Sequence, residues 1–296
     1  MTKIFLIYIN KPNIYNKERK IGMINITMIE KELKNKGFDV EVKNVEKNGV
    51  KKDGILFRGH LVDPVIYPEE HTYLKDLDSA LKTVLEAYHE SLKHVKDMAD
   101  FEQILDKYDS SNVYIAVQPK VGNPKYLTKD FLDLQLYIYV KIDKDHSAKV
   151  TRDLVSSWDV SVEEIWEDAF NNTESELIHK NLAEIVFGSD VCEDTDFLTA
   201  MGEHTQYVLT NKSGFKGASF ILFTDSLFEI YEKYGNDFYI IPSSIHELLT
   251  LPGKDATPDE VRRMIKEVND TEVSPEERLS YNVYKYDHVL NAVVML

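Results

Sequence analysis

The sequence of 296 residues contains one cysteine, Cys192, so no disulfide can form within the chain. A single cysteine is typical of proteins kept in a reducing compartment, which predicts a cytoplasmic location. The neighbours of Cys192, in the string DVCEDTD, are acidic and would disfavour a reactive thiolate. No stretch approaches the roughly 20 apolar residues of a membrane span, and the opening MTKIFLIYINKPN has no signal-peptide cleavage site. We therefore expect no membrane association.

Motifs that identify nucleotide-binding proteins and common hydrolases are also missing. The sequence contains no G-x-G-x-x-G, no G-x-x-x-x-G-K-[ST] and no G-x-S-x-G. It has neither an internal repeat nor a low-complexity linker. We therefore predict no cofactor and no bound metal, and we name no catalytic residue.

Charge is abundant but one-sided, with a net charge of −16. Residues 153–203 carry fourteen acidic side chains against one basic side chain, Lys180. A protein that binds nucleic acid through phosphates needs clustered cations, so we expect no direct nucleic-acid binding. An acidic surface can instead bind a basic protein or imitate a polyanion. The acidic residues that we predict to bind a protein partner are Glu163, Glu164, Glu167, Asp168, Glu193, Asp194 and Asp196.

The hydrophobic pattern of the first half alternates between strand and helix periods. Leu77, Ala80, Leu81, Val84 and Leu85 recur at helical spacing, which predicts a long amphipathic helix. A shorter helix is predicted around Phe101–Tyr108, as a separate element. The other predicted elements are strands at 3–10, 38–45, 54–59, 112–119 and 132–142 and a helix at 21–36.

The second half shows clear helix boundaries. Ser161 followed by Glu164 is the pattern of an N-terminal cap, and Thr257–Pro258 opens another helix. Gly235 is expected to end a third helix. Helices are predicted at 162–170, 182–187, 227–234 and from 258, and strands at 205–211, 217–224, 237–242, 280–287 and 290–296. The elements together predict an α+β fold with mixed or mainly antiparallel sheets and packed helices, in two lobes, 1–150 and 151–296, or in one domain.

The string YIIPSSIHELLTLP, residues 239–252, raises the question of a metal site. A zinc-protease helix needs H-E-x-x-H, and the position four residues after His246 holds Thr250 instead of histidine. Pro242 and two serines favour a strand followed by a turn. We nevertheless name Ser243, Ser244, His246 and Glu247 as candidate binding residues.

A glycine- and lysine-containing string, Lys212–Gly217, could hold an anion. A hairpin turn between the strands predicted at 205–211 and 217–224 also explains these residues, and it is the interpretation that we prefer.

Three strings of the C-terminal part resemble a known family. QYVLTNKSGFKGASFILF, GNDFYIIPSSIHELLTLP and LSYNVYKYD are similar, in this order, to an uncharacterised domain-of-unknown-function family of Gram-positive, Clostridia-type bacteria and their mobile elements. The order of elements is similar by pattern to the uncharacterised YtpQ-like family. Neither family has an assigned activity, so the resemblance implies a shared fold and a bacterial or phage origin.

These observations lead to three hypotheses about function. The first is a non-enzymatic, acidic, protein-binding accessory factor of a phage or mobile element, which inhibits host defence by imitating nucleic acid. The second is a metal-assisted hydrolase that uses the region of His246 and Glu247. The third is a purely structural or scaffolding protein.

Overall fold

The computed structural model describes residues 24–47, 50–59, 65–68, 76–122, 125–142, 147–187 and 206–296. The strands in these ranges pair antiparallel throughout and form three sheets accompanied by helices. This confirms the predicted α+β class. No helix within the described ranges is long and apolar enough to cross a membrane.

The chain forms two compact units, Asn16–Tyr108 and a second unit that contains Asp109–Leu296. The sequence analysis placed the division at 150/151 instead. The strands between residues 113 and 149 belong with the C-terminal part because a helix at residues 162–176 packs against the first of them.

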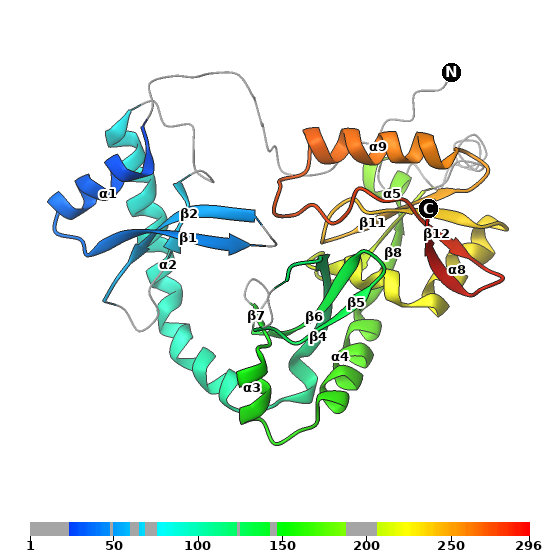
Figure 1. Ribbon diagram of the computed structural model, residues 1–296, viewed down its shortest axis with the longest axis horizontal. Coiled ribbons are helices and arrows are strands. Elements are labelled where there is room, and N and C mark those ends of the chain that lie inside the picture. Colours follow the sequence, from blue (N-terminus) through cyan, green and yellow to red (C-terminus); the bar gives the residue numbers. More distant parts are fainter. Residues whose placement is uncertain are drawn as a thin grey trace. The chain divides into compact units, whose positions relative to one another are not determined.

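The unit Asn16–Tyr108 combines a small sheet with two helices (Figure 1). Its core contains the stacked rings of Phe57 and Tyr88, whose centroids lie 4.0 Å apart, together with Leu33 and Val84. The elements are α1 (Ile26–Asn35), β1 (Val40–Lys47), β2 (Val50–Phe57), β3 (Val65–Ile66) and α2 (Leu77–Asp106).

Helix α2 corrects one prediction of the sequence analysis. The helices predicted around 77–95 and 101–108 form one continuous helix of 30 residues. Its sequence contains neither glycine nor proline, so nothing in it ends the helix between the two apolar stripes. The side chain of Asp76 caps the start by accepting a hydrogen bond from the Ser79 backbone N–H at 2.8 Å.

The unit containing Asp109–Leu296 begins with a four-stranded sheet, in which β6 is the central strand (Figure 1). Strand β4 pairs with one edge of β6. Strands β5 and β7 pair with the other edge, β5 along residues 134–137 and β7 along residues 139–141 of β6. The elements of this part are η2 (Ser110–Asn112), β4 (Val113–Pro119), β5 (Thr128–Phe131), β6 (Leu134–Lys141), β7 (Ser147–Lys149), α3 (Arg152–Ser157) and α4 (Val162–Glu176). Ser161 caps α4 by accepting from the Glu164 N–H, as predicted.

A six-stranded sheet follows, in the order β13-β12-β10-β11-β9-β8. Its central strands are buried on both faces, and α9 and α8 cover opposite faces (Figure 1). Phe238 and Ile240 pack with α8, whereas Tyr239 and Ile241 pack with α9, because neighbouring side chains of a strand alternate between faces. The elements are β8 (Leu177–Asn181), α5 (Leu182–Phe187), β9 (Tyr207–Asn211), η3 (Gly217–Leu222), α8 (Thr224–Tyr234), β10 (Phe238–Ile241), β11 (Leu248–Pro252), α9 (Pro258–Thr271), β12 (Tyr284–Asp287) and β13 (Ala292–Met295).

The prediction of a strand at 217–224 is wrong. Residues Gly217–Leu222 form the 3-10 helix η3, and β9 pairs with β8 and β11 rather than with this segment. The segment is rich in strand-forming residues, but it is buried on all sides and packs against the turn after β10, where the Ala218 N–H donates to the Ile245 carbonyl. Tertiary packing therefore overrides the local preference.

Candidate functional site

The sheet of β4, β5, β6 and β7 has two chemically different faces. One face carries Ile115 and Val117 of β4 and Ile138 of β6, which are buried. The opposite face carries Tyr137 and Tyr139 of β6, because these positions alternate with the apolar ones. Lys149 of β7 is paired with Tyr139 and therefore lies on the same face, as does Ser147, two residues before it. Gln118 lies on this face as well, because it is two residues from Ala116, the partner of Tyr137.

Two lysines contact this aromatic face. The ammonium group of Lys216 lies 4.0 Å from the ring centroid of Tyr139 and 5.7 Å from that of Tyr137. The ammonium group of Lys149 lies 4.2 Å from the Tyr137 centroid. Both cations are thus within cation–π range of the same ring. We call Gln118, Tyr137, Tyr139, Ser147, Lys149 and Lys216 the lysine–tyrosine cluster.

Neutral polar groups accept hydrogen bonds from both lysines of the cluster. Nζ of Lys216 donates to Oγ of Ser147 at 2.6 Å, and Nζ of Lys149 donates to Oε1 of Gln118 at 2.6 Å. Lys216 is only 8% exposed, and among the described residues no Asp or Glu forms an ion pair with it. A buried ammonium without a carboxylate is unusual, because lysine is rarely fully buried unless it is paired.

Burial changes the acid–base behaviour of the cluster. It lowers the pKa of Lys216 to about 7, and the positive charge of Lys149 acts in the same direction. Burial also lowers the pKa of Lys149 to about 8. The same burial raises the pKa of Tyr137 and of Tyr139, so both phenols keep their protons at neutral pH.

The backbone of Lys216 is held in a strained conformation. Its φ of 60° lies in the left-handed region, which is uncommon for a residue with a side chain. Its N–H donates to Nδ1 of His246 at 3.1 Å, so Nδ1 is an acceptor and carries no proton. A Cβ on the next residue, Gly217, would lie 2.3 Å from Oγ1 of Thr210 and 2.7 Å from the carbonyl oxygen of His246. Only glycine fits at position 217, and this steric constraint fixes the direction of the neighbouring Lys216 side chain.

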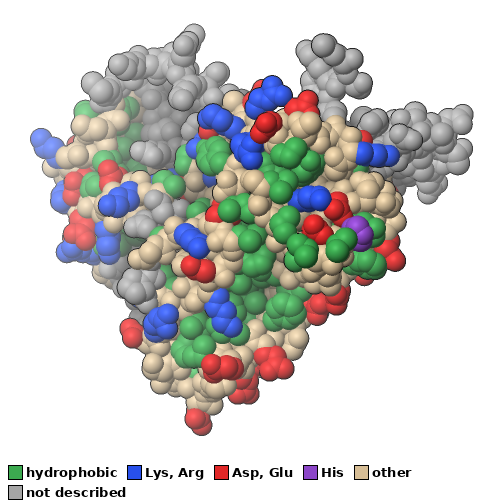
Figure 2. Space-filling model, turned by 45° about the vertical axis from the view of Figure 1, so that its right-hand side comes forward, with side chains coloured by type: hydrophobic (Ala, Val, Ile, Leu, Met, Phe, Trp, Pro, Cys, Tyr) green, Lys and Arg blue, Asp and Glu red, His purple; other side chains and the backbone are tan. Residues whose placement is uncertain are grey.

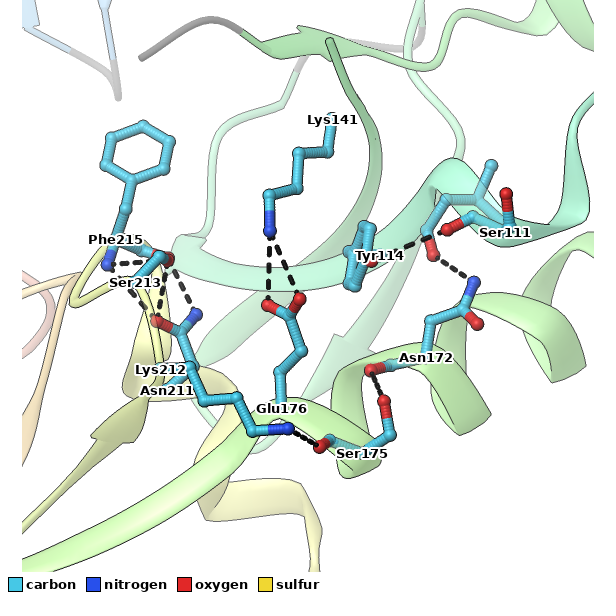
Figure 3. Close-up of polar contacts among 11 residues, drawn as sticks. Ser111, Tyr114, Lys141, Asn172, Ser175, Glu176, Asn211, Lys212, Ser213 and Phe215 are labelled. Carbon is cyan, nitrogen blue, oxygen red and sulfur yellow. Dashed lines mark hydrogen bonds and ion pairs between the residues drawn. The ribbon is translucent and has the colours of Figure 1, made fainter. Parts of the chain in front are cut away.

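The loop before Lys216 is ordered by one asparagine (Figure 3). Asn211 donates to the carbonyl of Phe215 at 2.8 Å and accepts from the Ser213 hydroxyl at 2.9 Å. Lys212 points the other way and donates to the carbonyl of Ser175 at 2.8 Å. The two lysines of this loop therefore differ, since Lys212 is exposed and Lys216 is buried.

A third lysine on the same face shows an ordinary arrangement. Lys141 lies 3.1 Å from Oε1 of Glu176 and 5.3 Å from the ring centroid of Tyr114 (Figure 3). Its charge is matched by a carboxylate from the end of α4. Lys216 has similar aromatic contacts, but among the described residues it has no such carboxylate. This difference distinguishes Lys216 from Lys141.

The candidate residues around His246 form a turn between β10 and β11, as the sequence analysis predicted. Ser244 caps it by accepting from the His246 N–H at 3.0 Å, and Ser243 donates to Glu247 at 3.5 Å. Burial raises the pKa of Glu247, although His246 and Ser243 act against this rise. Both serines are buried, and Nδ1 of His246 accepts a hydrogen bond from the Lys216 N–H. The turn therefore stabilises the backbone of the lysine–tyrosine cluster at Lys216.

The structure offers no support for a metal centre at this turn. Within the described ranges, no group of three His, Cys, Asp or Glu side chains could hold a metal ion. Nε2 of His246 faces Oε1 of Glu277 at 3.7 Å rather than a second histidine.

The predicted acidic residues are brought together only in part. Glu163, Glu164 and Glu167 lie exposed on α4, and Asp168 is half-buried. Figure 2 shows Asp and Glu side chains gathered toward the lower end of the face that it draws. Glu193, Asp194 and Asp196 lie outside the described residues.

Sequence reasoning missed the members of the cluster on β6 and β7. The strand 132–142 was predicted, but none of its tyrosines was named as a candidate site residue, and β7 was not predicted. The available signal was the alternation of Tyr137 and Tyr139 with Ile138, which places both tyrosines on one face. Lys216 lay in a string recognised as able to hold an anion, but the hairpin interpretation was preferred.

A protein-family model described as a family of unknown function, DUF5688, matches residues 25–288. The chain belongs to this family. No curated protein and no solved structure matches it. The DUF5688 match extends over both compact units and contains the whole lysine–tyrosine cluster. The predicted strand at 3–10 lies before the match begins.

Proposed function

We propose that this DUF5688 protein binds a small anionic ligand at the lysine–tyrosine cluster. The observation that carries the proposal is the buried ammonium of Lys216, which has aromatic rings and a serine hydroxyl as neighbours and no carboxylate among the described residues. A buried charge is destabilising unless a counter-charge compensates it. An anionic ligand would supply that counter-charge.

The chemistry of the cluster favours a carboxylate or a phosphate. At a pH below about 7, Lys149 and Lys216 both carry a positive charge. The phenols of Tyr137 and Tyr139 remain hydrogen-bond donors. Charge-assisted hydrogen bonds to such oxygen anions are stronger than neutral ones. The rings of Tyr137 and Tyr139 also suit a ligand with an apolar portion, because most small-molecule sites are partly apolar.

Thermal unfolding with inorganic phosphate, at constant ionic strength, tests this proposal. Phosphate should raise the Tm of the full-length protein by about 2 °C or more relative to chloride. The rise should disappear in Lys216→Gln and persist in Lys212→Gln, which removes an exposed lysine of the same loop. It should also weaken as the pH rises through about 7, where Lys216 loses its proton. An equal rise in all three proteins would contradict the proposal.

A further variant tests whether the chain supplies its own counter-charge. Asp143 and Asp145 precede Ser147 closely in the sequence. In the double variant Asp143→Asn/Asp145→Asn, phosphate should stabilise the protein as it does the unmodified chain. Stabilisation that appears only in the double variant would show that these carboxylates occupy the site and would overturn the proposal.

A second candidate function is the binding of a basic protein partner by α4. Glu163, Glu167, Phe170 and Glu174 are exposed and recur at the spacing of one helix face. Like charges one turn apart repel, and a basic partner would relieve the repulsion. This arrangement supports the predicted protein-binding accessory factor of a phage or mobile element, acting in the cytoplasm and inhibiting host defence by imitation of nucleic acid.

Affinity capture from bacterial lysate, with nuclease present, tests the second candidate. The triple variant Glu163→Lys/Glu167→Lys/Glu174→Lys should lose a partner that the unmodified protein retains. Lysine substitutions at the exposed Glu232, Glu267 and Glu272, on α8 and at the end of α9, provide the matched control for charge. Retention of the partner by the α4 variant, with the fold intact, would remove this candidate.

A further inference from the structure

We propose that Lys216 is a nucleophilic amine that forms an imine with the carbonyl carbon of an oxo acid. An oxo acid carries an aldehyde or ketone together with a carboxylate. The inference rests on the proposed anion site and assigns its ligand class, because the carboxylate would be the anion and the carbonyl would be the reacting group.

The surroundings of Lys216 are those of an amine that reacts rather than one that forms an ion pair. Lysines become nucleophilic when they are desolvated in an apolar pocket or lie next to another cation. The rings of Tyr139 and Phe215 lie 4.0 Å and 4.8 Å from its ammonium, and Lys149 supplies the neighbouring charge. No described carboxylate holds a proton on the amine.

Within the described ranges, the charged and titratable groups around the amine come from four elements. Lys149 belongs to β7, Tyr137 and Tyr139 belong to β6, and His246 belongs to the turn after β10. Glu176 at the end of α4 acts on Tyr139 and is itself paired with Lys141. Of these groups, Lys149 is the one whose charge lowers the pKa of Lys216. At pH 7.5 most Lys216 side chains are therefore neutral, whereas an ordinary lysine is neutral in about one molecule in a thousand.

Imine formation needs only the neutral amine of Lys216 and the oxo acid, and it releases one water molecule. The lone pair of neutral Nζ adds to the carbonyl carbon, so that a C–N bond forms and the C=O π bond breaks. A proton moves from nitrogen to oxygen, which gives a carbinolamine, and the loss of one water molecule leaves the imine. The hydroxyl of Ser147, at 2.6 Å from Nζ, is placed to relay this proton. Lys149 is placed to attract the carboxylate.

The strained backbone of Lys216 serves this chemistry by fixing the amine. The left-handed φ of 60° is maintained by the hydrogen bond to His246 and by the close contacts of Gly217. Strained residues that the surroundings hold in place are concentrated at functional sites. His246 is thus a positioning residue, which acts through the Lys216 backbone.

Reductive trapping of the full-length protein tests the inference. Glyoxylate, the smallest oxo acid, is added with sodium cyanoborohydride, which reduces an imine to a stable secondary amine. Peptide mapping by mass spectrometry should show that Lys216 is modified at least ten-fold faster than Lys212 at pH 7.5. Its rate should rise with pH to a plateau, with a midpoint at about 7. Lys149→Gln should move the midpoint upward because it removes the neighbouring charge, and Lys216→Arg should abolish the fast adduct.

The outcomes distinguish this inference from the proposed function. If phosphate stabilises the protein but Lys216 reacts no faster than Lys212, the inference is overturned and the anion site stands. If phosphate has no effect and Lys216 is also unreactive, both fail. Fast trapping that inorganic phosphate slows supports both, because the two ligands then compete for one site.

Discussion

The hydroxyl of Tyr284 donates a hydrogen bond of 2.6 Å to Oδ1 of Asp133, although the two residues lie 151 positions apart in the chain. Asp133 follows β5 in the turn to β6, and Tyr284 begins β12, so the bond joins the two sheets of this unit. Oδ2 of Asp133 accepts two more hydrogen bonds, from Ser280 at 2.7 Å and from Asn282 at 2.8 Å. One carboxylate thus receives three donors from the segment that leads into β12.

Replacement of Asp133 by alanine should destabilise the protein by about 3 kcal/mol, because it leaves buried donors without an acceptor. Burial alone raises the pKa of Asp133, but the hydrogen bonds from Tyr284, Ser280 and Asn282 lower it more, and the net shift is downward. The folded pKa lies below the unfolded one, so this stabilisation is present above the unfolded pKa and is lost as the pH falls through the folded one. Urea unfolding at pH 7 and pH 3 measures both effects.

Asp130 provides the control for Asp133. It lies in the preceding strand, β5, and forms an exposed ion pair with Lys120 at 3.0 Å. Exposed pairs contribute at most about 1 kcal/mol, so Asp130→Ala should change stability little. Equal losses in the two variants would contradict the role assigned to Asp133.

Gly217→Ala should destabilise the protein by roughly 2–4 kcal/mol, because the new methyl group meets Thr210 and two backbone atoms of the packed turn. Gly214→Ala is the matched comparison in the same loop. Its φ of +68° is strained for alanine, but nothing lies within 4 Å of the added Cβ. The loss there should be about 1 kcal/mol. Denaturant unfolding of both variants measures the difference, and a larger loss at Gly214 would be the contrary result.

Lys216→Met should change the pH dependence of stability. The amine titrates near 10.5 in a model compound and at about 7 in the folded protein. Between these values the unfolded state binds more protons, so the stability of the unmodified protein rises with pH. The methionine variant lacks this group, and its stability relative to the unmodified protein should be greater at pH 6 than at pH 10 by roughly 2–4 kcal/mol. A difference that does not vary with pH would show that Lys216 titrates normally.

His246→Ala should destabilise the protein by about 1–2 kcal/mol, because the Lys216 N–H loses its acceptor. The same variant should slow reductive trapping at Lys216, since the amine is no longer fixed. Elemental mass spectrometry should find the same metal content in the unmodified protein and in His246→Ala. A bound metal lost in His246→Ala would instead restore the hydrolase hypothesis.

Much of this fold is visible in local sequence signals. The caps at Ser161 and Thr257 and the glycine after Tyr234 correctly predicted where α4 and α9 begin and where α8 ends. Alternating apolar residues predicted β1, β4, β6 and β9. Short strands such as β5, β7 and β8 were missed because three to five residues carry too little periodicity.

The candidate site was less predictable for a different physical reason. Three helices and two strands of the described chain lie between Lys149 and Lys216 in the sequence. Only the pairing of β7 with β6 and the burial of loop 211–217 bring the two lysines to one aromatic face. The local sequence around Lys216 predicts an exposed lysine in a turn. That no described carboxylate pairs with Lys216 depends on tertiary packing, which no local sequence pattern contains.

The hydrogen bonds of Asp133 also have a consequence for biosynthesis. Ser280 is made 147 residues after Asp133, an interval of roughly 10–30 s at ordinary rates of translation. During that interval the carboxylate has no partner from β12, and the edge of β10 that β12 later covers stays open to other strands. The nascent chain is therefore vulnerable to aggregation, and in need of a chaperone, until the hairpin of β12 and β13 emerges from the ribosome.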